Sequence, residues 1–350
     1  MKWLAQTHGR QFELVRHFLR RMFDGEWSSS PGQWRSGAIG AVSLLLPSGL
    51  LLIREGALDP RYAPKHHLLE TAAGRNGIHS AALADELALI TLLLCVTGLI
   101  ALLVWQSLFP SARDYLALAS LPVRAGQVST ARFTSVTLFA AAIVIAMNIL
   151  PSLIAPVEFG GEWRLDASYV RHAAAQAAAS GLACLFVFFA IVALQGVLLN
   201  LAPRSQFTRT SVYAQGALAA IFLLGGFYSW SIKDWNPAVV AKLPAFGGWL
   251  PPVWFTGLHE RLIGKGDSFQ AEMSNRALLA TAIAVAMAAV TYFTSYRRYR
   301  KLLLESPARQ ETRGLWRWSI LTLLARSPRQ RGVMDFMAKT LVRSRAHRLL

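Results

Sequence analysis

The chain has 350 residues, of which 54% are hydrophobic and only 16% are charged, and its formal net charge is +17. A soluble protein can be this apolar, but it does not normally hold its apolar residues in blocks of about 18 or more, as this chain does. The composition therefore argues against an ordinary soluble protein of two domains and predicts an integral membrane protein. The two cysteines, Cys95 and Cys184, fall inside apolar blocks, which argues against a disulfide framework.

Residues 1–35 form a basic segment that is too long and too polar for the positive region of a cleavable signal peptide. Apolar residues recur there at helical spacing: Phe12, Val15, Leu19 and Met22. Because arginines lie on or beside the opposite face, this pattern predicts an amphipathic helix at the inner membrane interface. A solvated cytoplasmic helix is the alternative.

Six apolar blocks follow, and each is long enough for a helix that rises 1.5 Å per residue to cross a hydrocarbon core of about 30 Å. They lie near residues 36–53, 87–106, 133–155, 177–199, 211–230 and 277–296. No block has a charged residue in its interior, and none shows the alternation of a barrel strand, so the blocks are predicted to be helices. The expected fold class is therefore all-α, a polytopic transmembrane helix bundle of about six spans over residues 36–296.

The distribution of basic residues predicts the orientation of the spans. The segments before the first span and after the second, fourth and sixth hold 25 of the 36 Lys and Arg residues. Because cytoplasmic loops are enriched in these residues, both termini are predicted in the cytoplasm, with the spans in a bacterial inner (plasma) membrane. The basic face also meets anionic lipid head groups, which accounts for the net charge without nucleic acid as a partner.

The deepest polar side chains of the predicted spans are Asn148 and Gln195. They either hydrogen-bond between helices or line a path through the bundle. Small residues at every fourth position predict two close helix contacts: Ala173, Ala177 and Gly181, and Ala280, Ala284 and Ala288. Proton-coupled and sodium-coupled carriers usually keep charged residues in their spans, so here the energy for any transport is expected to come from elsewhere.

The segment 231–275, predicted on the outer side, is rich in aromatic residues and prolines and is expected to include a short helix around residues 254–263. His66, His67 and His79 share another outer loop, but their spacing matches no strong metal-binding pattern. The string GLHERLIGK at residues 257–265 has the wrong spacing for a phosphate-binding loop. Neither a catalytic residue, nor a cofactor, nor a metal site is predicted in this chain.

Residues 297–350 are predicted to form a basic cytoplasmic tail. An apolar stretch at residues 314–325 is too short to span a membrane. A second amphipathic stretch follows, in which five residues share one face: Val333, Phe336, Met337, Thr340 and Leu341. Since its pattern is similar to that of the segment before the first span, the chain is expected to be a truncated form of a longer protein with further spans.

The predicted inner loop after the second span reads WQSLFPSARDYLALASLPVRAGQVSTARF, residues 105–133. Its Phe-Pro turn, its Arg-Asp pair, its short apolar helix and its Leu-Pro-Val-Arg string resemble the permease subunits of ATP-binding-cassette exporters of the type-2 export class. The strings PPVWFTGLHERLIG at 251–264 and FMAKTLVRSRAHR at 336–348 look like the same group, which includes uncharacterised bacterial permease-like proteins. In such permeases the short cytoplasmic helix of this loop is where the ATPase docks.

The resemblance implies a transmembrane permease subunit that relies on a separate cytosolic ATP-binding subunit, with a second permease copy or half as a further partner. The candidate docking residues are Arg113, Asp114, Tyr115, Leu118, Leu121 and Arg124. From the residues alone, the apolar ones among them share a helical face that fits either a partner's groove or the chain's own bundle and lipid. Two other functions stay open. One is a scaffold or assembly protein that binds through residues 231–275, and the other is an enzyme that acts on lipid-linked substrates through outer acids such as Glu162 and Glu260.

Overall fold

A computed structural model of the chain describes these residues: 11–19, 72–109, 125–160, 167–201, 204–232, 235, 237–240 and 242–305. The first predicted span, near residues 36–53, lies outside them, as does the tail beyond residue 305. The chain divides into a unit of residues 1–300 and a second unit of residues 301–350, and of the second only the end of one helix is described.

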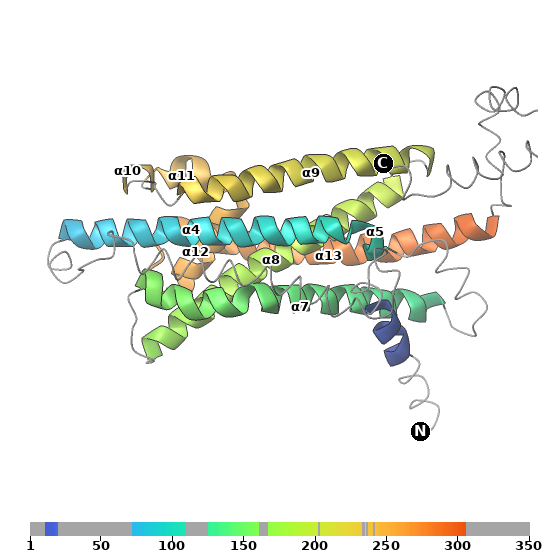
Figure 1. Cartoon of the computed structure of the whole chain (residues 1–350), viewed down its shortest axis with the longest axis horizontal. Coiled ribbons are helices and arrows are strands. Elements are labelled where there is room, and N and C mark those ends of the chain that lie inside the picture. The colour runs from blue at the N-terminus through green and yellow to red at the C-terminus, as the bar shows by residue number, and fades with distance from the viewer. Residues whose placement is uncertain are drawn as a thin grey trace, which may run out of the picture. The chain divides into compact units, whose positions relative to one another are not determined.

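Five long helices make up most of the described part of the chain (Figure 1): α4 (Ala72–Leu103), α7 (Ala125–Gly160), α8 (Ala167–Leu201), α9 (Arg204–Ile232) and α13 (Ser268–Glu305). Each contains a segment that is long and apolar enough to cross a membrane: His79–Leu103, Gly126–Pro156, Ala167–Leu201, Arg209–Ile232 and Ser268–Ser295. The prediction of an all-α polytopic helix bundle is confirmed, and the chain is a multi-pass membrane protein.

The helices are longer than the apolar blocks that predicted them. For example, α4 begins at Ala72 although its apolar block begins near residue 87. Backbone hydrogen bonds continue a helix beyond the hydrophobic residues that place it in lipid, so hydropathy underestimates its length. As a result, the apolar segments of the helices take in charged residues that lie just outside the predicted spans, such as Glu86 in α4 and Arg132 in α7.

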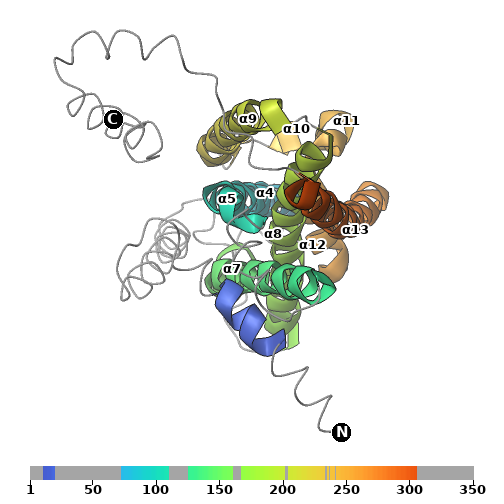
Figure 2. The same ribbon diagram turned by 90° about the vertical axis from the view of Figure 1, so that its right-hand side faces the viewer.

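Helix α8 packs against α7, α4 and α9, and Figure 2 shows it in the middle of the bundle. Its buried side carries Ala175, Ala179 and Ala183, whereas Ala177 of the predicted small-residue contact is exposed. Residues 173–179 are almost all alanine, so their hydropathy does not distinguish one face from another. Small residues do lie in the packed face, but of the predicted α8 set only Gly181 is buried, near Val144 of α7.

Helices α8 and α13 approach each other closely at Gly196. A Cβ atom added there would lie 2.4 Å from Oγ1 of Thr291. Ser295 Oγ donates a hydrogen bond to the Gly196 carbonyl (3.3 Å), and Asn200 Nδ2 donates to the Thr291 carbonyl (3.2 Å). Absence of a side chain at Gly196 thus allows two interhelical hydrogen bonds to form.

Short helices connect α9 to α13: α10 (Pro237–Val240), α11 (Leu243–Phe246), the 3₁₀ turn η1 (Gly247–Trp249) and α12 (Pro251–Ile263). Helix α12 occupies the place where a short helix is expected, and it packs against α8 and α4 with Phe255 and Leu258 buried. Figure 1 shows α10 to α12 at one end of the long helices. The short helix α5 (Trp105–Leu108) lies at the other end, with residues 11–19.

Candidate functional site

Residues 11–19 are helical and lie against the beginning of α7. Phe18 is buried against Val128 and Ala131 of α7, and Ser135 Oγ donates a hydrogen bond to the Val15 carbonyl (3.1 Å). Phe12, the first residue of the predicted apolar stripe, is exposed. The packed face therefore includes Val15 and Leu19 of that stripe together with Phe18, which the stripe did not contain, and this part of the N-terminal segment is held by protein contacts.

Arg132 joins three segments at this end of the bundle. Its side chain is buried, with 2% of its surface exposed. Its Nη2 donates a hydrogen bond to the Ser107 carbonyl of α5, and its guanidinium carbon lies 4.8 Å from the centroid of the Phe18 ring, a cation–π geometry. Ser107 precedes segment 110–124 and Arg132 follows it, so this one side chain ties both flanks of the segment to the N-terminal helix.

Gln195 and Asn148, the two deep amides, lie between helices. Gln195 Nε2 donates a hydrogen bond to the Trp105 carbonyl (2.9 Å), and Trp105 Nε1 donates to Ser211 Oγ of α9 (3.0 Å). Asn148 Nδ2 lies 3.7 Å from Cys184 Sγ of α8. These contacts link α5 to α8 and α9, and α7 to α8.

We expect Gln195→Met to lower the free energy of unfolding by about 1 kcal/mol, because it removes the hydrogen bond between Gln195 of α8 and the Trp105 carbonyl of α5. Thermal unfolding of the purified chain in detergent micelles measures the change. Leu194→Met alters the neighbouring, partly exposed residue and should shift stability by less than about 0.5 kcal/mol. Equal stability of the two variants would contradict the interhelical role of the amide.

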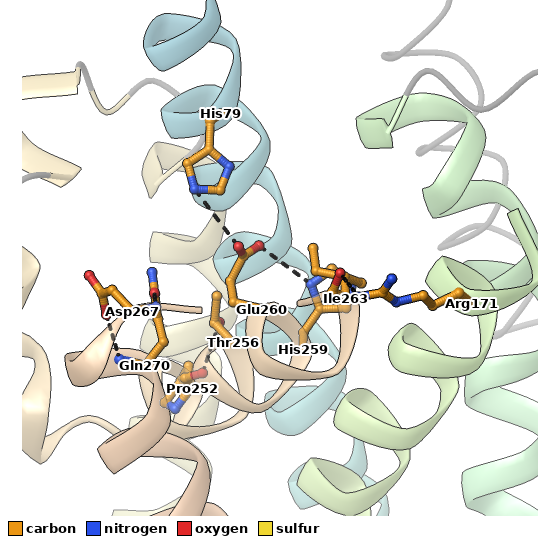
Figure 3. A network of polar contacts seen from close by, with 9 residues as sticks. All are labelled: His79, Arg171, Pro252, Thr256, His259, Glu260, Ile263, Asp267 and Gln270. Carbon is orange, nitrogen blue, oxygen red and sulfur yellow. Dashed lines mark hydrogen bonds and ion pairs between the residues drawn. The ribbon is translucent and has the colours of Figure 1, made fainter. Parts of the chain in front are cut away.

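A second polar cluster lies at the α12 end of the bundle (Figure 3). Glu86 of α4, Gln176 of α8 and Glu260 of α12 are only 2%, 1% and 4% exposed. Glu260 Oε1 lies 3.7 Å from His259 Nδ1, and Glu260 Oε2 lies 3.8 Å from His79 Nε2 of α4. Glu86 lies close enough to His259 and Glu260 for their charges to act on it, with the Gln176 amide beside it.

Arg171 of α8 fixes the end of α12 next to this cluster. Its Nε donates a hydrogen bond to the Leu262 carbonyl (3.3 Å), and its Nη2 donates to the Ile263 carbonyl. Helix α12 ends at Gly264, whose φ of 80° is readily adopted only by glycine. A cation at the last carbonyls of a helix also interacts favourably with the helix dipole. Arg171 therefore positions Glu260, one turn earlier, against α4 and α8.

The charge balance of the cluster depends on groups that titrate. Within the described residues, Glu260 forms ion pairs with the two histidines and not with Lys or Arg, and neither oxygen of Glu86 has a hydrogen bond of normal geometry. Burial opposes protonation of His259, but the charges of Glu86 and Glu260 outweigh it, so the pKa of His259 lies above its ordinary value. Paired acids beside an imidazole are able to bind, hold and release protons.

The sequence analysis identified only some of the residues of these clusters as candidates. Glu260 stood among the outer acids and His79 among the loop histidines, but Glu86, Gln176 and Arg132 were not candidates. The only signal in the sequence for Glu86 was its position directly before an apolar block. The predicted docking residues lie outside the described part of the chain: Arg113, Asp114, Tyr115, Leu118, Leu121 and Arg124. In the described part, no three His, Cys, Asp or Glu side chains are arranged to hold a metal ion.

No protein-family model matches the chain, and no curated protein or solved structure is significantly similar to it. Its function is therefore inferred from its own residues, because a helix bundle is compatible with many activities.

Proposed function

We propose that this chain is the transmembrane permease subunit of an ATP-driven exporter that relies on a separate cytosolic ATPase. The observation that best supports this is the Arg132 contact, which joins Ser107, α7 and the N-terminal helix around segment 110–124. The proposal places the chain in a bacterial plasma membrane with both termini in the cytoplasm, in accord with the distribution of basic residues. In that orientation segment 110–124 faces a cytosolic partner.

The hydrogen bonds at this end provide a route by which movement of segment 110–124 would reach the bundle. The Arg132 contact makes α5 and α7 move together. Gln195 connects Trp105 of α5 to α8, and Trp105 connects in turn to Ser211 of α9. If an ATPase displaced segment 110–124, the displacement would thus reach α7, α8 and α9 through the hydrogen bonds of Arg132, Gln195 and Trp105. Substitution of any of these three residues would test the route.

The membrane-enzyme alternative gains one observation, because Glu86, His259 and Glu260 converge as acid–base groups from two helices. Both carboxyl groups are closed to solvent, however, and a catalytic acid or base must reach the proton that it transfers. The exporter is therefore the better-supported function. A scaffold role gains no specific contact from the described residues.

Co-purification tests the proposal. A tagged full-length chain, expressed with its neighbouring genes, should carry with it a protein that hydrolyses ATP. With the double variant Tyr115→Glu/Leu118→Glu, the ATP hydrolysis that co-purifies should fall at least tenfold, because charges would face the partner's groove. The control Gly126→Glu adds a charge at an open position near the same loop and should keep it. No ATP hydrolysis with the wild-type chain, or equal hydrolysis with the double variant, would refute the assignment.

A further inference from the structure

The cluster at the α12 end is surrounded by few groups of fixed charge. The titratable and charged residues that face it are His79, Asp85 and Glu86 of α4, Arg171 and His172 of α8, His259, Glu260 and Arg261 of α12, and Lys265 beyond α12. Arg171 is bound to the last carbonyls of α12, and Arg261 Nη1 donates to Asn275 Oδ1 of α13 (2.8 Å). In the described part of the chain, Glu260 is therefore paired only with histidines, and Glu86 lies near His259 and two further buried acids, Asp85 and Glu260.

The cluster buries several polar atoms that have no hydrogen bond of normal geometry. Among the described residues these are both oxygens of Glu86, both amide atoms of Gln176, Nδ1 of His259 and Oε2 of Glu260. An unpaired buried charge is more costly than an unpaired neutral group, so the two carboxylates are the least tolerated members of this set. A proton on a carboxyl group converts one acceptor into a donor and removes one negative charge. A bound proton would therefore reduce the cost of burying these carboxyl groups next to each other.

We propose that Glu86, His259 and Glu260 form a proton-binding site that holds α12 against α4 and α8. With the imidazole protonated and one carboxyl group neutral, the three residues carry no net charge, and burial is tolerated. After both protons leave, two buried carboxylates repel each other across the interface between α4 and α12, and the attachment of α12 weakens. This inference is independent of the exporter proposal, because it concerns the opposite end of the bundle.

The direction of the pH dependence follows from the charges. Because the pKa of His259 is raised, its contribution to stability is fully present below the ordinary histidine value of about 6.5. That contribution is lost as the pH rises through the folded-state value. Release of a proton from Glu86 would act in the same direction, so α12 should be held most firmly in mildly acidic solution. Phe255 and Leu258 are apolar and stay packed in the core at every pH, and so they limit the loss.

Thermal unfolding of the full chain in detergent micelles from about pH 6 to pH 9 tests the proposal. The wild-type Tm should fall as the pH rises, by about 2 °C per pH unit for each proton lost. Glu86→Gln keeps the shape of the side chain and removes its charge, so it should flatten this decline and exceed the wild-type Tm at pH 9. Glu272→Gln, an exposed acid paired with Arg276 on α13, should keep the wild-type profile. A Glu86→Gln profile parallel to the wild type would overturn the site.

Infrared difference spectroscopy of the wild-type chain gives a readout that does not depend on a variant folding. Exposed carboxyl groups are fully ionised above about pH 6, so a protonated-carboxyl band that disappears between pH 6 and pH 9 must come from a buried group. The band should be present in the wild-type chain and in Glu272→Gln, and weaker in Glu86→Gln. Absence of any such band in the wild-type chain would overturn the proposal.

Discussion

Arg132→Met should release residues 11–19 from α7 while the five long helices stay assembled. The substitution keeps the length of the side chain but removes the charged hydrogen bond to Ser107 and the cation–π contact with Phe18. The cation–π contact is the part of this network that reaches residues 11–19, and because Arg132 and Phe18 are only 2% and 1% exposed, it contributes about 2 kcal/mol. A loss of about 2 kcal/mol changes the ratio of docked to released N-terminal helix by roughly 30-fold.

Thiol cross-linking reports this release directly. Gln11 Nε2 lies 3.3 Å from Thr130 Oγ1 at exposed positions, so Gln11→Cys and Thr130→Cys should be joined by a short bismaleimide in the parent protein. The cross-linked yield should fall severalfold when Arg132→Met is added. Arg16→Met removes an arginine from the exposed side of the same helix and should leave the yield unchanged. Similar yields with and without Arg132→Met would show that the apolar contacts of Phe18 are sufficient.

The second large effect is expected at Gly257, where α12 meets α13. A Cβ atom there would lie 2.6 Å from Met273 Cβ and 2.9 Å from the Gln270 carbonyl oxygen. Neither atom is at the end of a flexible side chain, so Gly257→Ala must push the two helices apart. Overpacking of this kind costs about 1–3 kcal/mol, and the loss should appear as a lower Tm in detergent micelles.

Gly216→Ala is the matched control for this prediction. Gly216 lies in α9, and an added Cβ atom would have no other atom within 4 Å. The substitution should leave stability unchanged or raise it by up to about 1 kcal/mol, because alanine favours a helix more than glycine does. A Gly257→Ala protein as stable as Gly216→Ala would mean that α12 and α13 are free to separate without cost.

Hydropathy predicted five of the described helices because lipid imposes the same requirement on each of them, about 20 apolar residues without a charge in the middle. It placed their ends less well. The N-terminal part of α4, from Ala72 to Glu86, is polar enough to be read as a loop, yet it is helical and packs against α12. Backbone hydrogen bonding, which hydropathy does not measure, determines where α4 begins.

The polar clusters could not be predicted from local patterns because their members come from distant parts of the sequence. Glu86, Gln176 and Glu260 lie on three helices, and only the packing of α12 between α4 and α8 brings them together. Arg132 likewise looks like an ordinary basic residue at a membrane boundary until α5 and Phe18 are placed around it. The roles of Asn148 and Gln195 could be predicted, because an amide deep in a membrane span has few possible roles and a hydrogen bond between helices is the commonest one.

Because α4 is synthesised before α12, Glu86 must be inserted into the membrane before the α12 residues that surround it are made. Glu86 leaves the ribosome long before His259, and at 5–20 residues per second the delay is roughly 10–35 s. During that interval α4 must enter the translocon with an acid whose later histidine neighbour does not yet exist. Inserting an unpaired acid at this depth costs up to about 3 kcal/mol, and only in the finished bundle does the charge of His259 offset part of this cost. Glu86 is therefore a greater burden on the nascent chain than on the mature protein.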